Sequence, residues 1–349
     1  MKRLGLALFS VLAVLCTPAF ADPIADFYKG KQMQMVIRSG VGGGYDLYAR
    51  VLAKHIGKHI PGNPQVIPVN MPGGGGIKAA NYVAKVAPKD GTVITIQSQG
   101  LPVDQALDIS KGLEADLSTF NWIGNMSSGN QVTVMWHTSK TQSWEDAMKR
   151  ETLLGTTGAG SISTQIPAIY NNVLGAKFRL VVGYTDGAAV NLAMERGEVE
   201  GRATNPWVSY KAVTPHLIEK KWIKPIVQIG MTKEDDLPDV PLMRDLAKTP
   251  EQKAIVDFIS RSVGVGRPIA TTPGVPAERV AALRKAFDAT LKDPEFIAEA
   301  EKQRMEIQPM TGQELAQLIN DIINAPADIK AKVKEAIVPK DTQDAPKAK

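Results

Sequence analysis

The residues with the clearest potential for chemistry are two glycine-rich segments, each of which follows a predicted strand. Gly40-Val41-Gly42-Gly43-Gly44 comes after residues 34–38, and Gly73 to Gly76 comes after residues 65–70. Glycine lets a ligand approach the backbone closely and supplies positive φ angles where a turn needs them. The N–H groups at a helix start lack intrahelical partners, and the helix dipole adds partial positive charge there. The two segments therefore predict a pocket for a carboxylate or a similar anion.

Neither glycine segment fits a nucleotide-binding motif. The first begins like G-x-G-x-x-G, but Tyr45 stands where the third glycine belongs, and residues 66–70 contain no acid. Gly73 to Lys78 lacks the G-K-[ST] of a P-loop. A single loop of this kind would be explained by a tight turn alone. Because two occur on neighbouring predicted strands, ligand contact is the favoured interpretation.

Three charged residues beside the predicted loops have two interpretations each. Asp46 either selects a ligand amine or hydroxyl or orients a water, or it is an acid of the first helical turn that the dipole favours. Arg38 and Arg202 occupy similar places in the two halves of the chain, and either could form a bidentate pair with a distal carboxylate. Ordinary surface ion pairs are the expectation for both arginines.

The sequence predicts no catalytic residue, no metal site and no cofactor. His55 and His59 stand at i, i+4, but Ile56 replaces the glutamate of H-E-x-x-H and no third ligand is near, so we expect solvated helix residues. No G-x-S-x-G elbow is present, and four histidines leave few candidates for a base, so we expect no enzyme. Trp207 is the one tryptophan placed to stack on an aromatic acid, against the general expectation that tryptophans pack in cores.

Alternating strands and helices must position the glycine loops. Strands are predicted at 34–38, 65–70 and 92–97, with helical patterns between them, and this order requires a parallel sheet with right-handed crossovers. A second set of strands is predicted at 132–136, 153–156, 178–182, 198–203 and 226–229. Helical patterns at 280–291 and 315–322 are too few for a third domain. We therefore expect domain 1 at 22–125 plus 263–337, domain 2 at 126–262, and a disordered tail at 338–349.

The start of the chain predicts export. Lys2 and Arg3 precede an apolar run at 4–15, and Ala19-Phe20-Ala21 follows, which is typical of a secretory signal peptide at 1–21 with cleavage after Ala21. The only cysteine, Cys16, lies inside this segment. The mature chain is therefore expected in the periplasm without a disulfide or a thiolate site.

Composition excludes other classes of protein. The 349 residues are 44% hydrophobic and 22% charged, as in an ordinary globular protein. The net charge is only +5, and no block of Lys and Arg could follow a phosphate backbone, so a nucleic-acid partner is not expected.

Several of these motifs resemble one receptor family. Gly42 to Asp46 with Ala49-Arg50 resembles the G-G-x-x-D-x-x-A-R signature of the extracytoplasmic solute-binding receptors of tripartite tricarboxylate transporters, the Bug-type or TctC-like proteins. Asn70 to Gly76 resembles their N-x-P-G-A-G-G loop, and Pro88 to Thr92 resembles their P-D-G-Y-T-L turn. Later segments also fit the family, at 158–161, 184–188, 197–199 and 273–276.

The resemblance implies an α/β, two-domain periplasmic binding protein fold, type II-like, with two open sheets, flanking helices and a ligand cleft between the domains. It implies that the two glycine loops of the first domain grip one carboxylate through backbone amides and ordered waters, and that loops of the second domain complete the site. The ligand-binding residues expected on this basis are Gly42, Gly43, Gly44, Tyr45, Asp46, Gly73, Gly74, Gly75, Gly76, Gly158, Ala159, Ser161, Tyr184, Thr185, Gly187, Ala188, Thr204 and Asn205.

The resemblance also implies a function. The expected protein is a monomeric receptor that captures a small mono- or dicarboxylate and delivers it to the subunits of a membrane transporter. The alternative is a ligand-sensing periplasmic partner of a membrane sensor kinase. Two departures from the family pattern alter the expected pocket: Ser39-Gly40-Val41 replaces a proline, and Thr185-Asp186 replaces Lys-Gly. The particular acid therefore does not follow from the resemblance.

Overall fold

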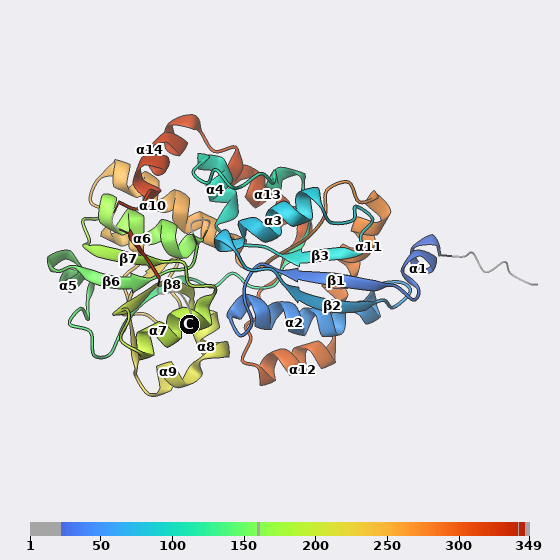
Figure 1. The fold of residues 1–349 in the computed structure, drawn as a ribbon, viewed down its shortest axis with the longest axis horizontal. Helices are drawn as coiled ribbons and strands as arrows, with labels where there is room; N and C mark the ends of the chain where they lie inside the picture. Colours follow the sequence, from blue (N-terminus) through green and yellow to red (C-terminus); the bar gives the residue numbers. More distant parts are fainter. Residues whose placement is uncertain (1–21, 159–160, 341, 346–349) are drawn as a thin grey trace, which may run out of the picture.

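The computed structural model describes residues 22–158, 161–340 and 342–345. The predicted signal peptide and Ala159 lie outside these residues. Figure 1 shows two lobes side by side, each built on one sheet with helices around it.

The first lobe is built on a six-stranded mixed sheet. β1 (Gln32–Ile37) lies between β2 (Gln65–Asn70) and β3 (Val93–Ile96), and both pairings are parallel. β10 (Pro268–Thr271) is antiparallel to β3 and to β4 (Asn121–Asn125), and β11 (Met310–Thr311) completes the order β11-β4-β10-β3-β1-β2. Helix α3 (Ile77–Lys85) covers one face, and α2 (Gly44–Ile56) covers the opposite face (Figure 1).

The second lobe repeats this design with different connections. Its sheet has the order β12-β7-β6-β8-β5-β9. β6 (Thr152–Gly155) is parallel to β7 (Phe178–Val182) and to β8 (Gly201–Pro206). β5 (Gln131–Trp136) is antiparallel to β8 and to β9 (Ile223–Ile229). Helices α6 (Ile162–Asn172) and α7 (Gly187–Glu195) begin in the loops that follow β6 and β7.

The other α-helices surround the two sheets. They are α1 (Pro23–Tyr28), α4 (Leu101–Leu107), α5 (Trp144–Lys149), α8 (Trp207–Val213), α9 (Pro215–Glu219), α10 (Pro250–Ser262), α11 (Ala277–Thr290), α12 (Pro294–Lys302), α13 (Gly312–Ile323) and α14 (Ala327–Ile337). None of the helices within the described residues is both long and apolar enough to span a bilayer.

Three chain segments connect the lobes. The first two are hydrogen-bonded to each other, and the third leads from α13, which packs on β4, to β12 (Thr342–Asp344), which pairs with β7 in the second sheet. The chain leaves the first sheet after β4 and returns to it just before β10. The backbone N–H of Arg267 donates to the side chain of Asn125 over 2.6 Å and to the carbonyl of Ser127 over 3.0 Å. Gly266 has φ +56°, and a Cβ there would lie 2.0 Å from the Ser127 carbonyl oxygen, so this position requires glycine. We call these two hydrogen-bonded segments the hinge.

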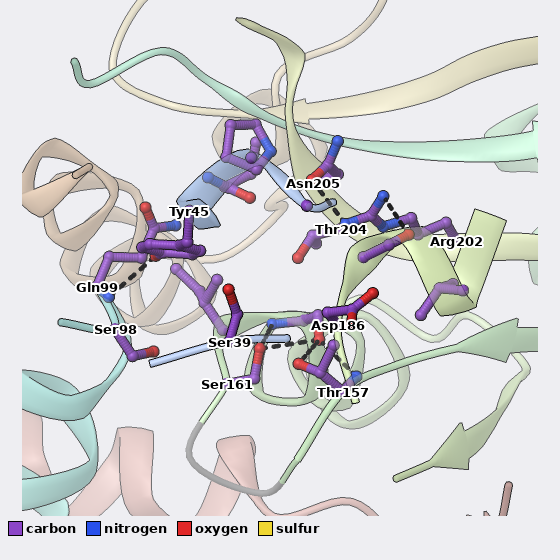
Figure 2. Close-up of a pocket in the computed structure, with 18 of the residues that line it drawn as sticks. Ser39, Tyr45, Ser98, Gln99, Thr157, Ser161, Asp186, Arg202, Thr204 and Asn205 are labelled. Carbon is purple, nitrogen blue, oxygen red and sulfur yellow. Dashed lines mark hydrogen bonds between the residues drawn. The ribbon is translucent and has the colours of Figure 1, made fainter. Parts of the chain in front are cut away.

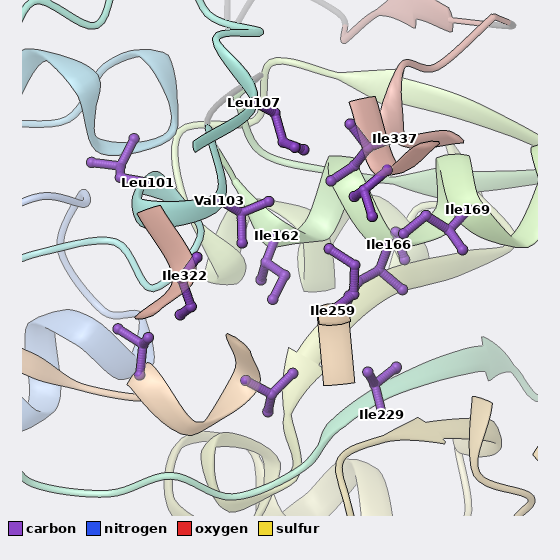
Figure 3. Close-up of a cluster of buried hydrophobic side chains, with 14 of the residues drawn as sticks. Leu101, Val103, Leu107, Ile162, Ile166, Ile169, Ile229, Ile259, Ile322 and Ile337 are labelled. Carbon is purple, nitrogen blue, oxygen red and sulfur yellow. The ribbon is translucent and has the colours of Figure 1, made fainter. Parts of the chain in front are cut away.

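The lobes also share apolar contacts. One buried cluster contains Leu101 and Val103 of α4 together with Ile162 and Ile166 of α6 and Ile337 of α14, and Figure 3 shows these side chains gathered between the helices.

A second cluster lies under α2, where Tyr48, Leu52 and Ile56 contact side chains of α11 and α12. The apolar spacing predicted for α2 therefore faces the core.

The structure differs from the predicted elements mainly near the carboxyl terminus. Residues 338–349 were expected to be disordered, but Thr342–Asp344 form β12, which pairs in parallel with β7, and the Ala345 N–H donates to the Val182 carbonyl over 2.7 Å. Helix α14 packs on α6 and α10 of the second lobe, whereas residues 263–337 were expected to belong to the first domain. Strand β8 also begins at Gly201, three residues after the predicted start.

Candidate ligand-binding site

A cavity lies between the two lobes, and its empty space of about 600 Å³ includes open solvent at its entrance. Its walls are the segments that follow β1, β3 and β6, together with β8 and the hinge residue Arg267. Helices α2, α6 and α7 each start at this cavity, because Gly44, Ile162 and Gly187 line it. The positive dipole ends of three helices therefore face the same space, although the side chains of Ser161 and Asp186 cap α6 and α7. The remaining lining residues are Arg38, Ser39, Gly43, Tyr45, Ser98, Gln99, Gln131, Gly155, Thr157, Ser161, Ser163, Asp186, Val190, Arg202, Thr204, Asn205 and Pro206.

Three buried arginines dominate the charge of the cavity. Arg38, Arg202 and Arg267 are 7%, 8% and 2% exposed. Among the described residues, none of the three forms an ion pair with a carboxylate within 4.0 Å. Burial lowers the pKa of Arg38 and of Arg202, because a buried guanidinium loses its hydration. The site is thus short of negative charge.

Two of these arginines lie against the ring of Tyr45. The Arg38 Cζ lies 4.8 Å from the ring centroid, and the Arg267 Cζ lies 4.4 Å from it. The Tyr45 hydroxyl accepts a hydrogen bond from the Gln99 N–H over 3.3 Å. The ring attracts both guanidiniums through its quadrupole and keeps them at the cavity. Arg267 also donates to the hydroxyl of Ser209 on α8, so it connects the hinge with the second lobe.

Arg202 is held differently, by neutral acceptors of the second lobe. Its Nη1 donates to the Gly187 carbonyl over 3.1 Å and to the Asn191 amide oxygen over 2.9 Å. Its Nη2 donates to the Asn205 amide oxygen over 2.7 Å, as Figure 2 shows. These bonds fix the side chain, and the charge of nearby Asp186 partly opposes the lowering of the Arg202 pKa by burial.

The acid among the lining residues is Asp186, which caps α7. Its Oδ1 accepts hydrogen bonds from the N–H groups of Ala188 and Ala189 over 2.8 and 2.9 Å. Its Oδ2 accepts from the Thr185 hydroxyl over 3.2 Å. The carboxylate is therefore used for the helix start, as is usual for an aspartate at this position.

Hydroxyl groups at the start of α6 form the floor of the cavity. Ser161 caps the helix by accepting from the Ser163 N–H over 3.2 Å, and the Ser163 hydroxyl accepts from the Thr157 N–H over 3.1 Å. Figure 2 shows Ser161 and Thr157 together with Asp186 on this side of the cavity, opposite Tyr45.

Several buried polar atoms of the lining have no hydrogen-bond partner among the residues that the structure describes. They are Arg38 Nε, Arg267 Nε, Gln99 Oε1, Gln131 Nε2 and Oε1, and Thr204 Oγ1. Buried polar groups are nearly always hydrogen-bonded, and each exception calls for an explanation such as a missing ligand or water. A polar ligand or ordered water in this cavity would supply their missing hydrogen bonds.

Asp46 stabilises the first glycine loop from behind. Its Oδ2 accepts from the Gly42 N–H over 2.9 Å, and its Oδ1 accepts from Arg50 Nε and Asn70 Nδ2, each over 2.8 Å. Asp46 does not line the cavity. The structure therefore favours the interpretation of Asp46 as a first-turn carboxylate over direct contact with a ligand.

The expected ligand-binding residues fall into two groups in space. Those that line the main cavity are Gly43, Gly44, Tyr45, Ser161, Gly187, Thr204 and Asn205. Those that line a neighbouring hollow are Gly73, Gly74, Gly75, Gly158, Tyr184 and Thr185, and Ala188 lines a smaller one beside α7. Gly42 and Gly76 line none of these three spaces.

Arg38 lies between the two glycine loops of the first lobe. Its side chain lines both the main cavity and the neighbouring hollow. A Cβ on Gly76 would lie 3.0 Å from Arg38 Nε, so the second loop packs directly against the guanidinium. The arginine thus fills the space between the loops.

Three expectations about single side chains require correction. Arg38 and Arg202 are buried in the cavity wall and do not form surface ion pairs. His55 is buried and its Nε2 lies 2.7 Å from Glu299, while His59 pairs with Asp293, because α12 covers this face of α2. Trp207 packs in a core cluster and donates to Asp236 over 2.7 Å, outside the cavity lining.

The residues missed by sequence reasoning come from all parts of the chain. Arg267 is the most important of them, and its only local signal is its position directly after the hinge glycine Gly266. Gln99 and Thr157 follow the ends of β3 and β6, where ligands of open α/β sheets are expected.

Comparison with solved structures identifies the architecture as that of periplasmic binding proteins. The periplasmic binding protein BugD superposes with a TM-score of 0.71 at 19% identity, over 90% of this chain and 100% of its own. MatC from Rhodopseudomonas palustris, solved with bound malate, superposes with a TM-score of 0.70 at 18% identity, over 87% of this chain and 99% of its own. A further R. palustris protein, solved with adipate, superposes with a TM-score of 0.67 at 19% identity, over 87% of this chain and 97% of its own.

The likeness confirms the predicted α/β periplasmic binding fold, with two mixed sheets and flanking helices. No protein-family model matches the chain, and no curated protein sequence matches it.

Proposed function

We propose that the chain is an extracytoplasmic solute-binding receptor of the Bug-type, TctC-like family, and that it captures a small organic carboxylate between its lobes. The observation that carries the proposal is the cationic interlobe cavity, where three buried arginines and the single carboxylate of Asp186 lie beside three helix starts. The cavity lies between the lobes and is lined by residues of both, which suits a small molecule and not a folded partner. The fold neighbours solved with malate and with adipate support an organic acid as the ligand.

Binding would be coupled to closure of the lobes. The hinge at Asn125–Ser127 and Arg267 lets the lobes rotate as bodies, and the ligand would contribute contacts to both. The first lobe offers Arg38, Tyr45 and the start of α2, and the second offers the starts of α6 and α7. Since closure removes water from the cavity, the attraction between the acid and the arginines would strengthen as the lobes meet.

We propose binding without turnover. The side chains that line the cavity include serines and threonines but neither histidine nor lysine, and Asp186 is occupied with capping α7. The lining therefore offers no base to activate a hydroxyl nucleophile. The receptor would act in the periplasm after export and deliver the acid to the subunits of a tripartite membrane transporter. The second candidate is the same receptor recognised by a sensor kinase.

Ligand-dependent stabilisation tests the proposal. Mature protein is heated with mono-, di- and tricarboxylates, and hits are measured by calorimetry. An acid present at 100 times its Kd raises the unfolding free energy by about 2.7 kcal/mol, which is a clear shift in Tm. If no acid in a broad panel shifts the Tm, the proposed function is wrong.

A deletion strain separates the two roles. Loss of the gene should abolish uptake of the bound acid if the protein serves a transporter. Uptake that persists, with loss of the transcriptional response to the acid, would favour the sensory role.

A further inference from the structure

We propose that Arg267 is a positioning residue that makes closure of the lobes depend on a bound anion. This inference rests on the proposed function and concerns how the same cavity responds to being filled. The charge of Arg267 opposes closure of the empty receptor. Its hydrogen bond to Ser209 holds the lobes together once an anion has neutralised that charge.

Arg267 lies where three parts of the molecule meet. Its backbone N–H donates to the Asn125 side chain in the hinge over 2.6 Å. Its guanidinium lies on α2 of the first lobe, with Cζ 4.4 Å and 5.1 Å from the ring centroids of Tyr45 and Tyr48. Its Nη2 donates to the hydroxyl of Ser209 on α8 of the second lobe. One residue therefore joins the hinge to both lobes.

The hydrogen bond to Ser209 belongs to the closed arrangement of the lobes. A Cβ on Gly44, the first residue of α2, would lie 2.6 Å from the Ser209 hydroxyl oxygen and 2.8 Å from Arg267 Nη2. The start of α2 thus packs directly against both partners of the bond. Because Gly44 and Ser209 are in different lobes, rotation at the hinge would draw them apart and break this contact.

The same arrangement brings like charges together. Three buried guanidiniums line the cavity, those of Arg38, Arg202 and Arg267. Asp186 supplies the single carboxylate of the described lining residues, so two positive charges are in excess. Figure 2 shows Arg202 across the cavity from Tyr45, the ring on which Arg267 lies. Closing an empty cavity therefore moves like charges out of water and toward each other, which is unfavourable.

The groups around Arg267 do not remove this repulsion. Burial is the main cause that lowers the pKa of Arg38 and of Arg202, and the positive charge of Arg267 lowers both further. Burial raises the pKa of Tyr48, so the second ring beside Arg267 stays neutral. Arg267 Nε is buried without a hydrogen-bond partner among the described residues. An anion in the cavity would accept from this donor and reduce the repulsion.

The two properties of Arg267 act in opposite directions. A hydrogen bond to one hydroxyl contributes less than the burial of an unpaired charge costs, so repulsion decides the position of the lobes in the empty receptor. When an anion occupies the cavity, the repulsion is removed and the bond to Ser209 remains. Closure then follows occupancy.

Fluorescence energy transfer between the lobes tests the inference. Dyes are placed on cysteines introduced at exposed Lys140 of the second lobe and exposed Lys285 of the first. The ligand-free protein is measured in a buffer without carboxylates, phosphate or sulfate, and then with malate and with adipate. The unaltered protein should be open without acid and should close when an acid binds.

Variants of Arg267 separate its charge from its place in the packing. Arg267→Gln keeps a side-chain donor and removes the charge, so it should raise the ratio of closed to open ligand-free protein about tenfold. Arg267→Lys keeps the charge and should remain open without acid. Arg261→Gln on α10 removes a charge from an exposed position and should behave like the unaltered protein.

A matched pair at Ser209 supplies the charge from the protein itself. Ser209→Asp places a carboxylate beside Arg267 and should also close the ligand-free protein. Ser209→Asn has the same size without the charge and should not. A purely structural role of Arg267 predicts no closure in response to an added charge.

The ligand-free measurements distinguish this inference from the proposed function. Closure of ligand-free Arg267→Gln supports the inference, whereas a variant that stays as open as the unaltered protein overturns it. An unaltered protein that is already closed without an anion overturns it as well, even if acids bind. If no acid binds, the proposed function fails, and the ligand-free comparison still decides the role of Arg267. Should Arg267→Gln not fold, the comparison of Ser209→Asp with Ser209→Asn decides it.

Discussion

Asp46 shows how a single carboxylate can support a binding loop that it does not line. It joins the Gly42 N–H, Arg50 and Asn70, so the first glycine loop is tied both to α2 and to the end of β2. Asp46→Asn replaces charge-assisted bonds with weaker ones and should lower the free energy of unfolding by about 2 kcal/mol. Urea unfolding and calorimetry measure the effect, and ligand affinity should fall with it because Gly43 and Gly44 line the cavity. The exposed Asp288→Asn on α11 serves as control, and equal behaviour of the two variants would contradict this role.

Asp104 makes the stability of the fold depend on pH. Burial raises the pKa of this α4 carboxyl to about 6, although the hydroxyl of Ser110 opposes the shift. Between about pH 4 and pH 6, the folded protein therefore holds a proton that the unfolded chain has released. The stability that comes with this protonated carboxyl is complete below pH 4 and is lost as pH rises through 6. Asp104→Asn should therefore raise the free energy of unfolding by on the order of 2 kcal/mol at pH 7.5 and leave it unchanged at pH 4. Thermal melts across this range, with Asp288→Asn as control, would show a constant difference if the interpretation were wrong.

At the level of single residues, the sequence predicts the loop side chains better than the cationic ones. Tyr45, Ser161 and Asn205 lie in or beside motifs, and the structure places all three in the cavity wall. Arg38 and Arg267 are far apart in the chain, and their shared contact with Tyr45 depends on the return of the chain at β10. No local pattern contains that contact, so sequence reasoning treated Arg38 as a surface residue and passed over Arg267.

Among the elements, the loops that meet across the cleft control closure. A Cβ on Gly158 would lie 2.3 Å from the backbone nitrogen of Gly75, so the loop after β6 touches the second glycine loop directly. Backbone atoms cannot move aside as a flexible side chain can. Gly158→Ala should therefore hold the lobes apart and weaken ligand binding about tenfold or more, although Gly158 does not line the main cavity.

Gly112→Ala is the matched control, since its Cβ would meet only an ordinary contact at 3.9 Å. Calorimetry gives the affinities, and small-angle scattering gives the degree of closure with ligand. Full affinity in Gly158→Ala would show that this contact does not govern closure.

The elements themselves follow from hydrophobic periodicity where it is strong. The ranges predicted at 65–70 and 178–182 coincide with β2 and β7, and α2 has its predicted buried face. The strand order and the antiparallel insertion of β10 beside β3 could not be read from local patterns, because strand pairing depends on contacts between distant segments. The same reason explains β12, whose short polar sequence gives no strand signal by itself.

At the scale of the whole molecule, ion pairs near the surface also join the lobes. Lys211 of α8 pairs with Glu306, and Arg304 pairs with Glu219 of α9. The side chains of the first pair are 25% and 35% exposed, whereas those of the second are 58% and 61% exposed. Exposed pairs contribute less than about 1 kcal/mol and are screened by salt, so the first pair should matter more.

Glu306→Gln should therefore shift the ligand-free protein toward an open form and weaken ligand binding about threefold, while Glu219→Gln should have a smaller effect. Fluorescence energy transfer between dyes on the two lobes measures the opening. Glu114→Gln, which breaks the Lys85 pair within the first lobe, is the control. An equal response of all three variants would argue against a role in closure.

Strand β12 matters for anyone who handles the protein at the bench. It occupies the outer edge of the second sheet, where β7 would otherwise offer a row of unpaired donors and acceptors to other molecules. Trimming the chain before Thr342 to aid crystallisation would uncover that edge and promote association between copies. Affinity tags and fluorescent fusions attached beyond Ala345 would crowd the same place, so labels belong elsewhere on the molecule.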